Sequence, residues 1–125
     1  MKGIRPLAVV AGLLVAGVAY LALKFGAVTV IWLAHQTSAS ALWWALMLLV
    51  VGLSEAGGGF VAARMSKLNP LGAAIAVGIL DLLGASWFVL RPGGLAWDWW
   101  MSLIYLALIV PSALAGGHLA RSRTA

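Results

Sequence analysis

The sequence predicts an all-α membrane protein, an antiparallel bundle of four transmembrane helices. Three observations predict this fold: the composition, four long apolar runs, and the placement of the basic and tryptophan residues. Of the 125 residues, 64% are hydrophobic and 9% are charged, whereas soluble domains are about 45–50% apolar and about 25% charged. A chain this apolar cannot cover a water-facing surface, so we expect the lipid bilayer to be its main partner.

The apolar runs define one domain over residues 1–125. They cover residues 7–34, 41–63, 71–90 and 99–120. A helix needs about 20 apolar residues to cross the hydrocarbon core of a bilayer, and all four runs reach that length. The breaks between them are short and polar, so neighbouring helices must run antiparallel.

The basic residues predict the orientation of the bundle. Cytoplasmic loops of membrane proteins carry an excess of lysine and arginine. With four spans, one side of the membrane would hold Lys2, Arg5, Arg64, Lys67, Arg121 and Arg123. The other side holds Arg91, which Asp98 offsets. Both termini are therefore expected in the cytoplasm, and the expected membrane is a bacterial inner (cytoplasmic) membrane.

Seven tryptophans give an independent indication of the same orientation. Indole rings prefer the headgroup level of a bilayer, where the ring is half apolar and its N–H is wet. All seven fall at the predicted non-cytoplasmic helix ends, where we expect them to be interface anchors: Trp32, Trp43, Trp44, Trp87, Trp97, Trp99 and Trp100.

The first apolar run has a second interpretation, as a secretory signal peptide. Lys2 and Arg5 would form its basic region and residues 7–23 its apolar core. Lys24 and Phe25 follow directly, without the small-x-small pattern of a cleavage site, so we expect a retained transmembrane helix.

Two hairpins, residues 1–67 and 68–125, are a possible duplication. The second and fourth runs end similarly, at residues 58–64 and 116–121: two glycines, an aromatic ring, an aliphatic residue, alanine and arginine. The alternative is that small residues before a basic helix end recur by chance.

Small residues at four-residue spacing predict the faces on which the helices pack. Such residues let membrane helices approach closely without a hydrophobic driving force. The candidate packing residues are Gly12, Ala16, Gly57, Gly58, Gly59, Gly78, Gly116 and Gly117. In the fourth helix, Pro111 predicts a kink, and one side is expected to hold Ser102, Tyr105 and Ser112.

Three ionisable residues lie inside the predicted spans: Lys24, Glu55 and Asp81. Each costs about 2.5–3.5 kcal/mol at the bilayer centre unless it is paired or hydrated. They are therefore expected to face the interior of the bundle. An ion pair between Lys24 and Asp81 would neutralise both charges and fix the helix register. The alternative is a proton or cation relay in which Asp81 or Glu55 titrates during transport.

Other functional chemistry finds little support. The chain has no cysteine, which excludes disulfides, thiolate metal sites and cysteine nucleophiles. His35 and His118 are predicted at opposite membrane faces and have no metal-ligand spacing. We therefore expect no enzyme, no cofactor and no metal. We also expect no nucleic-acid partner, because the net charge of +5 follows the pattern of a topology signal.

By length and helix count the chain is similar to two families, the small multidrug-resistance transporters and the fluoride channels. The similarity ends at architecture. Where those transporters carry a membrane-embedded glutamate in the first helix, this chain carries Lys24. Where the channels have a phenylalanine-rich polar stretch in the third helix, residues 81–88 read DLLGASWF.

Two functions therefore remain open. The sequence favours a non-catalytic accessory or assembly subunit that packs against other membrane helices. The alternative is a small homo-oligomeric transporter or channel that uses Asp81, Glu55 and Lys24. A transport path needs these residues to face a wet cavity, whereas a scaffold needs them paired and dry.

Overall fold

The computed structural model describes residues 4–35, 41–90 and 99–124, and these residues contain four helices and no strand. The helices are α1 (Pro6–Leu33), α2 (Ala41–Met65), α3 (Pro70–Leu90) and α4 (Trp99–Thr124). Each is long and apolar enough to span a membrane, which confirms the predicted four-helix membrane bundle. The predictions for Lys2, Arg91, Trp97 and Asp98 lie outside the described residues.

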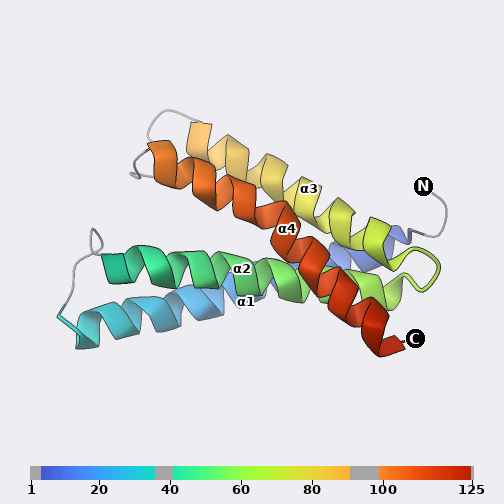
Figure 1. The fold of residues 1–125 in the computed structure, drawn as a ribbon, viewed down its shortest axis with the longest axis horizontal. Helices are drawn as coiled ribbons and strands as arrows, with labels where there is room; N and C mark the ends of the chain where they lie inside the picture. The colour runs from blue at the N-terminus through green and yellow to red at the C-terminus, as the bar shows by residue number, and fades with distance from the viewer. Residues whose placement is uncertain (1–3, 36–40, 91–98, 125) are drawn as a thin grey trace.

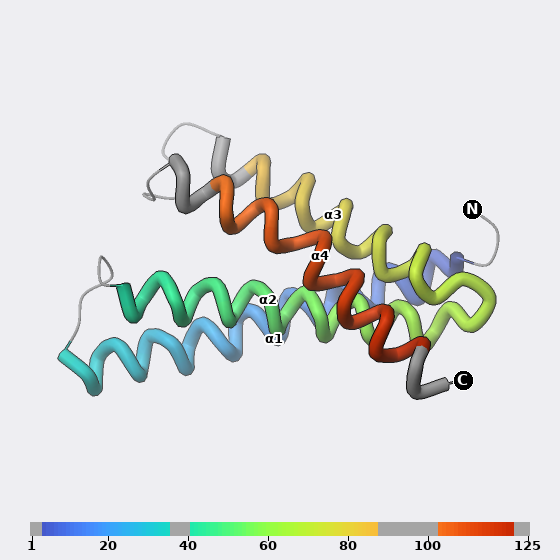
Figure 2. Tube along the Cα trace, in the orientation of Figure 1, coloured from blue at the N-terminus to red at the C-terminus, as the bar shows by residue number. Residues whose placement is uncertain are grey.

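The four helices form two antiparallel hairpins, α1–α2 and α3–α4, that diverge along the bundle (Figure 1). The hairpins lie close together at the end where α1 begins and α4 finishes. At the opposite end, where α2 and α4 begin, they are spread apart. Helix α2 packs against all three other helices. Helix α4 changes direction midway along its length (Figure 2), and Pro111 lies inside it.

Polar contacts hold the narrow end of the bundle together. Pro6 begins α1, and the backbone N–H of Arg5 donates to the buried Ser66 Oγ just after α2 (3.3 Å). Asn69 caps α3, because its side-chain oxygen accepts a hydrogen bond from the Gly72 N–H (3.0 Å). The first of these bonds connects the start of α1 to the end of α2, and the second caps the start of α3.

A dry apolar core fills the narrow end. Val9, Ala62, Ala73 and Val77 pack together there, from three different helices. Most of the large apolar side chains instead face outward, as for Leu14, which is 64% exposed. This pattern suits a lipid solvent, in which apolar side chains have no reason to withdraw from the surface.

The described tryptophans lie at one end of the bundle, and four of the described basic residues lie at the other. Trp32 ends α1, Trp43 and Trp44 begin α2, and Trp87 lies near the end of α3, all at the wide end. Trp99 and Trp100 begin α4 at that same end. Arg5, Arg64, Lys67 and Arg121 lie at or near helix ends on the narrow side. The two residue classes thus mark the two faces of the expected membrane.

The backbones of α2 and α4 touch where they cross. A methyl group added to Gly59 would collide with the backbone of Ala113, and one added to Gly116 would collide with the backbone of Ala56. The two contacts are reciprocal, because each glycine faces the alanine that lies three residues before the other glycine. Only glycine permits such an approach.

Other predicted packing glycines also lie at helix contacts. A methyl group at Gly12 would lie 2.6 Å from the Gly58 carbonyl oxygen, which marks the α1–α2 contact. One at Gly117 would lie 2.5 Å from the Ala74 Cβ, which marks the α3–α4 contact. Gly78 faces α4, and Ala16 is buried against Gly58. The duplication of the two hairpins stays a prediction.

We expect Gly59→Ala or Gly116→Ala to destabilise the bundle, because the new methyl group forces α2 and α4 apart. Overpacking of this kind costs about 1–3 kcal/mol. Thermal unfolding in detergent, followed by circular dichroism, measures the loss. Gly26→Ala is the matched control, because Gly26 has open space beside it, and an unfolding temperature equal for all three variants would contradict the crossing.

Candidate intramembrane acidic site

A cavity of about 250 Å³ lies beyond the glycine crossing, between the diverging hairpins. All four helices contribute to its wall. The lining residues are Ala16, Gly17, Tyr20, Val51, Ser54, Glu55, Asp81, Gly84, Ala85, Tyr105 and Ile109. Glu55 and Asp81 both lie near the middle of their helices, so the cavity falls within the expected hydrocarbon region.

Two carboxyl groups meet in this cavity. The side chains of Glu55 and Asp81 are joined by a hydrogen bond between α2 and α3. An ionised carboxylate only accepts hydrogen bonds, so this contact requires a proton on one of the two groups. The proton is held between carboxyl groups that would otherwise repel each other in a medium of low dielectric constant.

No donor group of the surrounding helices reaches one oxygen of each carboxyl group. Glu55 Oε2 and Asp81 Oδ2 are buried and accept no hydrogen bond from an N–H or hydroxyl group of the described residues, and the Glu55 residue as a whole is only 8% exposed. Buried polar atoms are satisfied in most native structures, so each exception calls for an explanation. Here both atoms belong to residues that line the same cavity.

Three hydroxyl groups accompany the carboxyl pair. Tyr20 of α1 and Tyr105 of α4 share a side-chain hydrogen bond that links the two hairpins. Ser54 Oγ donates to the Val51 carbonyl oxygen (3.1 Å), one turn back along α2. The wall of the cavity thus combines two carboxyl groups, two phenol rings and a serine.

Lys24 takes a different place from the expected one. Its ammonium group lies over the Tyr20 ring, 5.7 Å from the ring centroid, which is the range of a cation–π contact. The carboxyl group of Asp81 contacts Glu55 instead. The expected Lys24–Asp81 ion pair is therefore absent from the structure, and a contact between two acids takes its place.

Two exposed glycines line the cavity, one on α1 and one on α3. Gly17 and Gly84 line the cavity, are exposed, and have open space where a Cβ would project from the helix. Exposed apolar side chains follow on both helices, among them Val18 (67% exposed) and Leu83 (63% exposed). At these two glycines the cavity wall therefore adjoins an exposed apolar surface.

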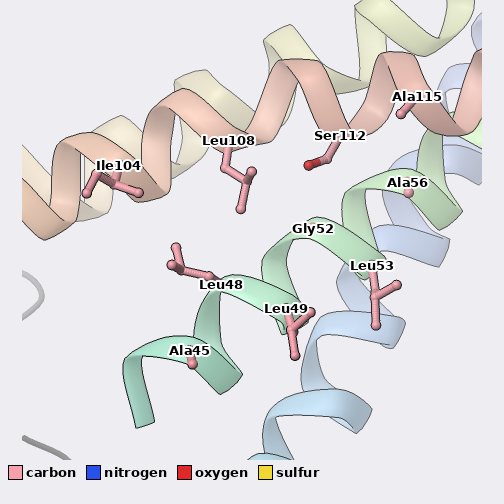
Figure 3. Close-up of a pocket in the computed structure, with 10 residues that line it drawn as sticks. All are labelled: Ala45, Leu48, Leu49, Gly52, Leu53, Ala56, Ile104, Leu108, Ser112 and Ala115. Atoms are coloured by element: carbon pink, nitrogen blue, oxygen red, sulfur yellow. The ribbon is translucent and has the colours of Figure 1, made fainter. Parts of the chain in front are cut away.

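A second hollow, of about 560 Å³, lies between α2 and α4 (Figure 3). Alanine, glycine and leucine side chains line most of it, from Ala45 to Ala56 on α2 and from Ile104 to Ala115 on α4. Ser112 supplies the one hydroxyl group of its lining, and its oxygen is directed toward α2. This hollow is an apolar groove without charged residues.

The polar residues expected on one side of α4 do not lie together, and the two histidines lie outside the acidic cavity. Tyr105 lines it, but Ser112 lies in the apolar groove, and the side chain of Ser102 is not among those described. His35, which adopts a positive φ of 56°, follows the end of α1, and His118 is exposed on α4. In the described part of the chain, no group of three or more histidine, cysteine, aspartate or glutamate residues is placed to hold a metal ion.

Sequence reasoning missed how the site is assembled. Tyr20 lies four residues from both Ala16 and Lys24, so the spacing alone places it on the same face of α1 as these two residues. The contact between Glu55 and Asp81 could not be predicted in this way, because spacing within one helix does not specify which helix packs against it.

Comparisons of the chain with protein-family models, with curated proteins and with solved structures find no match. Helices of the required length and composition identify the chain as a small, multi-pass integral membrane protein.

Proposed function

We propose that this chain is a small, non-enzymatic transporter or channel in which Glu55 and Asp81 exchange protons during transport. The observation that carries the proposal is their direct contact in a cavity within the membrane-spanning bundle. A scaffold would pair its buried charges and keep them dry, whereas these carboxyl groups face an open volume. An intramembrane acid placed in this way is a candidate proton or ion site.

The shared hydrogen bond supports proton exchange. Because one proton serves two carboxyl groups, a cation that displaces it leaves the total charge of the pair and its occupant unchanged. Exchange of one for the other then avoids the cost of an uncompensated charge in hydrocarbon.

The proposed orientation places the narrow end of the bundle, with both termini, in the cytoplasm of a bacterial inner membrane. Arg5, Arg64, Lys67 and Arg121 at that end support it, because basic residues are enriched on the cytoplasmic side. Four helices enclose little volume, so we propose that the protein acts as a homo-oligomer.

We expect the purified protein to dissipate a pH gradient across liposomes, and Glu55→Gln or Asp81→Asn to reduce this flux to that of protein-free liposomes. Each amide keeps the size of the side chain and removes the carboxyl group that exchanges the proton. A pH-sensitive dye inside the liposomes reports the flux.

Ser112→Ala is the control, because Ser112 is a polar residue of the same bundle that lines the other hollow. Flux in this variant should equal that of the unmodified protein. An unmodified protein that carries no flux, or flux that survives both neutralising substitutions, would refute proton exchange at this pair.

The apolar groove between α2 and α4 favours a second candidate function, that of an accessory subunit. Small residues such as Ala45, Gly52 and Ala115 line it, and small residues allow another membrane helix to approach closely. In this role the groove would receive a helix of a different membrane protein.

The composition of the native complex separates the two candidates. For the transporter we expect homo-oligomers alone after extraction into lipid nanodiscs, as measured by native mass spectrometry. Stoichiometric copurification of another membrane protein would instead support the accessory role. Leu48→Trp, which fills the groove, should then release that partner, while Leu14→Trp on the exposed face of α1 should retain it.

A further inference from the structure

We propose that the acidic cavity binds a lipophilic organic cation with N–H donors, such as an arylalkyl primary ammonium, which enters from the bilayer between α1 and α3. This inference rests on the proposed function and names the class of its substrate. It starts from two buried oxygens, Glu55 Oε2 and Asp81 Oδ2, that no N–H or hydroxyl donor of the described residues reaches.

The chemistry of the two oxygens selects the ligand's polar group. A carboxyl pair that holds one shared proton keeps one negative charge, and a hydrogen bond from a cationic N–H to a carboxylate is about twice as strong as one between neutral groups. A primary ammonium has three such donors and a positive charge. Lys24 does not supply this group, because its ammonium lies over Tyr20.

The size and lining of the cavity select the rest of the ligand. A dry cavity of about 150 Å³ is large enough to bind benzene, and this one holds about 250 Å³. Val51, Ile109 and Ala85 give it apolar walls, and two tyrosines add aromatic rings, which attract cations. An aromatic ring that carries a short ammonium arm matches both the volume and the walls.

The position of the opening selects the route. Gly17 of α1 and Gly84 of α3 both line the cavity, are exposed and have open space beside them, and exposed apolar side chains follow on both helices. A ligand that passes between these glycines comes from the hydrocarbon region. It must therefore be lipophilic enough to reside there, which excludes a hydrated inorganic ion.

The test uses radiolabelled benzylammonium and the full chain in lipid nanodiscs. We expect saturable binding that Glu55→Gln weakens at least about tenfold, because loss of one member of a buried charge pair is strongly unfavourable. Ethylbenzene, which has the same shape with carbon in place of the charged nitrogen, should not displace the probe. Displacement by ethylbenzene would show that the cavity recognises shape alone and would overturn the ligand class.

The route is tested by filling the opening. Gly17→Leu and Gly84→Leu should slow association of benzylammonium several-fold, while Gly26→Leu on the same helix as Gly17 should not. Gly26 is the matched control, because it is also exposed and has open space beside it. If one of these two blocking variants loses its helical circular dichroism, the association rate of the other variant tests the route. Unchanged association in a folded blocking variant would overturn entry between α1 and α3.

Different experimental results would refute this inference and the proposed function. If benzylammonium shows no saturable binding while Glu55-dependent proton flux persists, the substrate class is wrong and the transporter stands. If both binding and flux are absent, both proposals fall.

Discussion

The direct backbone contact between α2 and α4 determines where the other helices can lie. Gly59 and Gly116 bring the two helices together at one point, and the hairpins diverge on one side of it. On the narrow side the helices are close enough for Val9 and Val77 to form a dry core. On the wide side the separation leaves the volume that the carboxyl groups face. A closer, parallel packing along the whole length would have no room for that cavity.

The acidic pair shows how a bundle with few polar residues can keep two carboxyl groups in hydrocarbon. Glu55 and Asp81 lie on different helices, and each lowers the cost of burying the other by sharing a proton. Tyr20 and Tyr105 form a second polar link across the same space. The site therefore depends on all four helices, and it cannot form within one hairpin alone.

Much of the fold was predictable, because a bilayer imposes simple rules on a sequence. Helix length and hydropathy gave four spans whose ends agree closely with the structure, although α4 continues past residue 120 to Thr124, because residues 121–124 contain no glycine or proline. The packing faces that carry Gly12, Gly58 and Gly116 could be predicted because glycine is small enough to let helices approach closely. The Lys24–Asp81 pair did not form, because opposite charge alone does not determine which helices meet. A long, flexible lysine reaches the tyrosine one turn away on its own helix, whereas the short carboxyl side chains meet where the α2 and α3 backbones place them.

The hydrogen bond from Arg5 to Ser66 and the Asn69 cap make the two ends of the molecule mechanically unequal. The glycine crossing lies between the narrow end and the tryptophan-bearing end, so it is the point about which the two hairpins would pivot, and the Glu55–Asp81 and Tyr20–Tyr105 contacts would resist that motion. Ala41, the first residue of α2, lies 18 residues from Gly59, which is about 27 Å at 1.5 Å per residue. A rotation of about 10° at the crossing would thus displace the tryptophan-bearing end by roughly 5 Å. A small rotation at the glycine contact would therefore become a larger displacement at one face of the membrane.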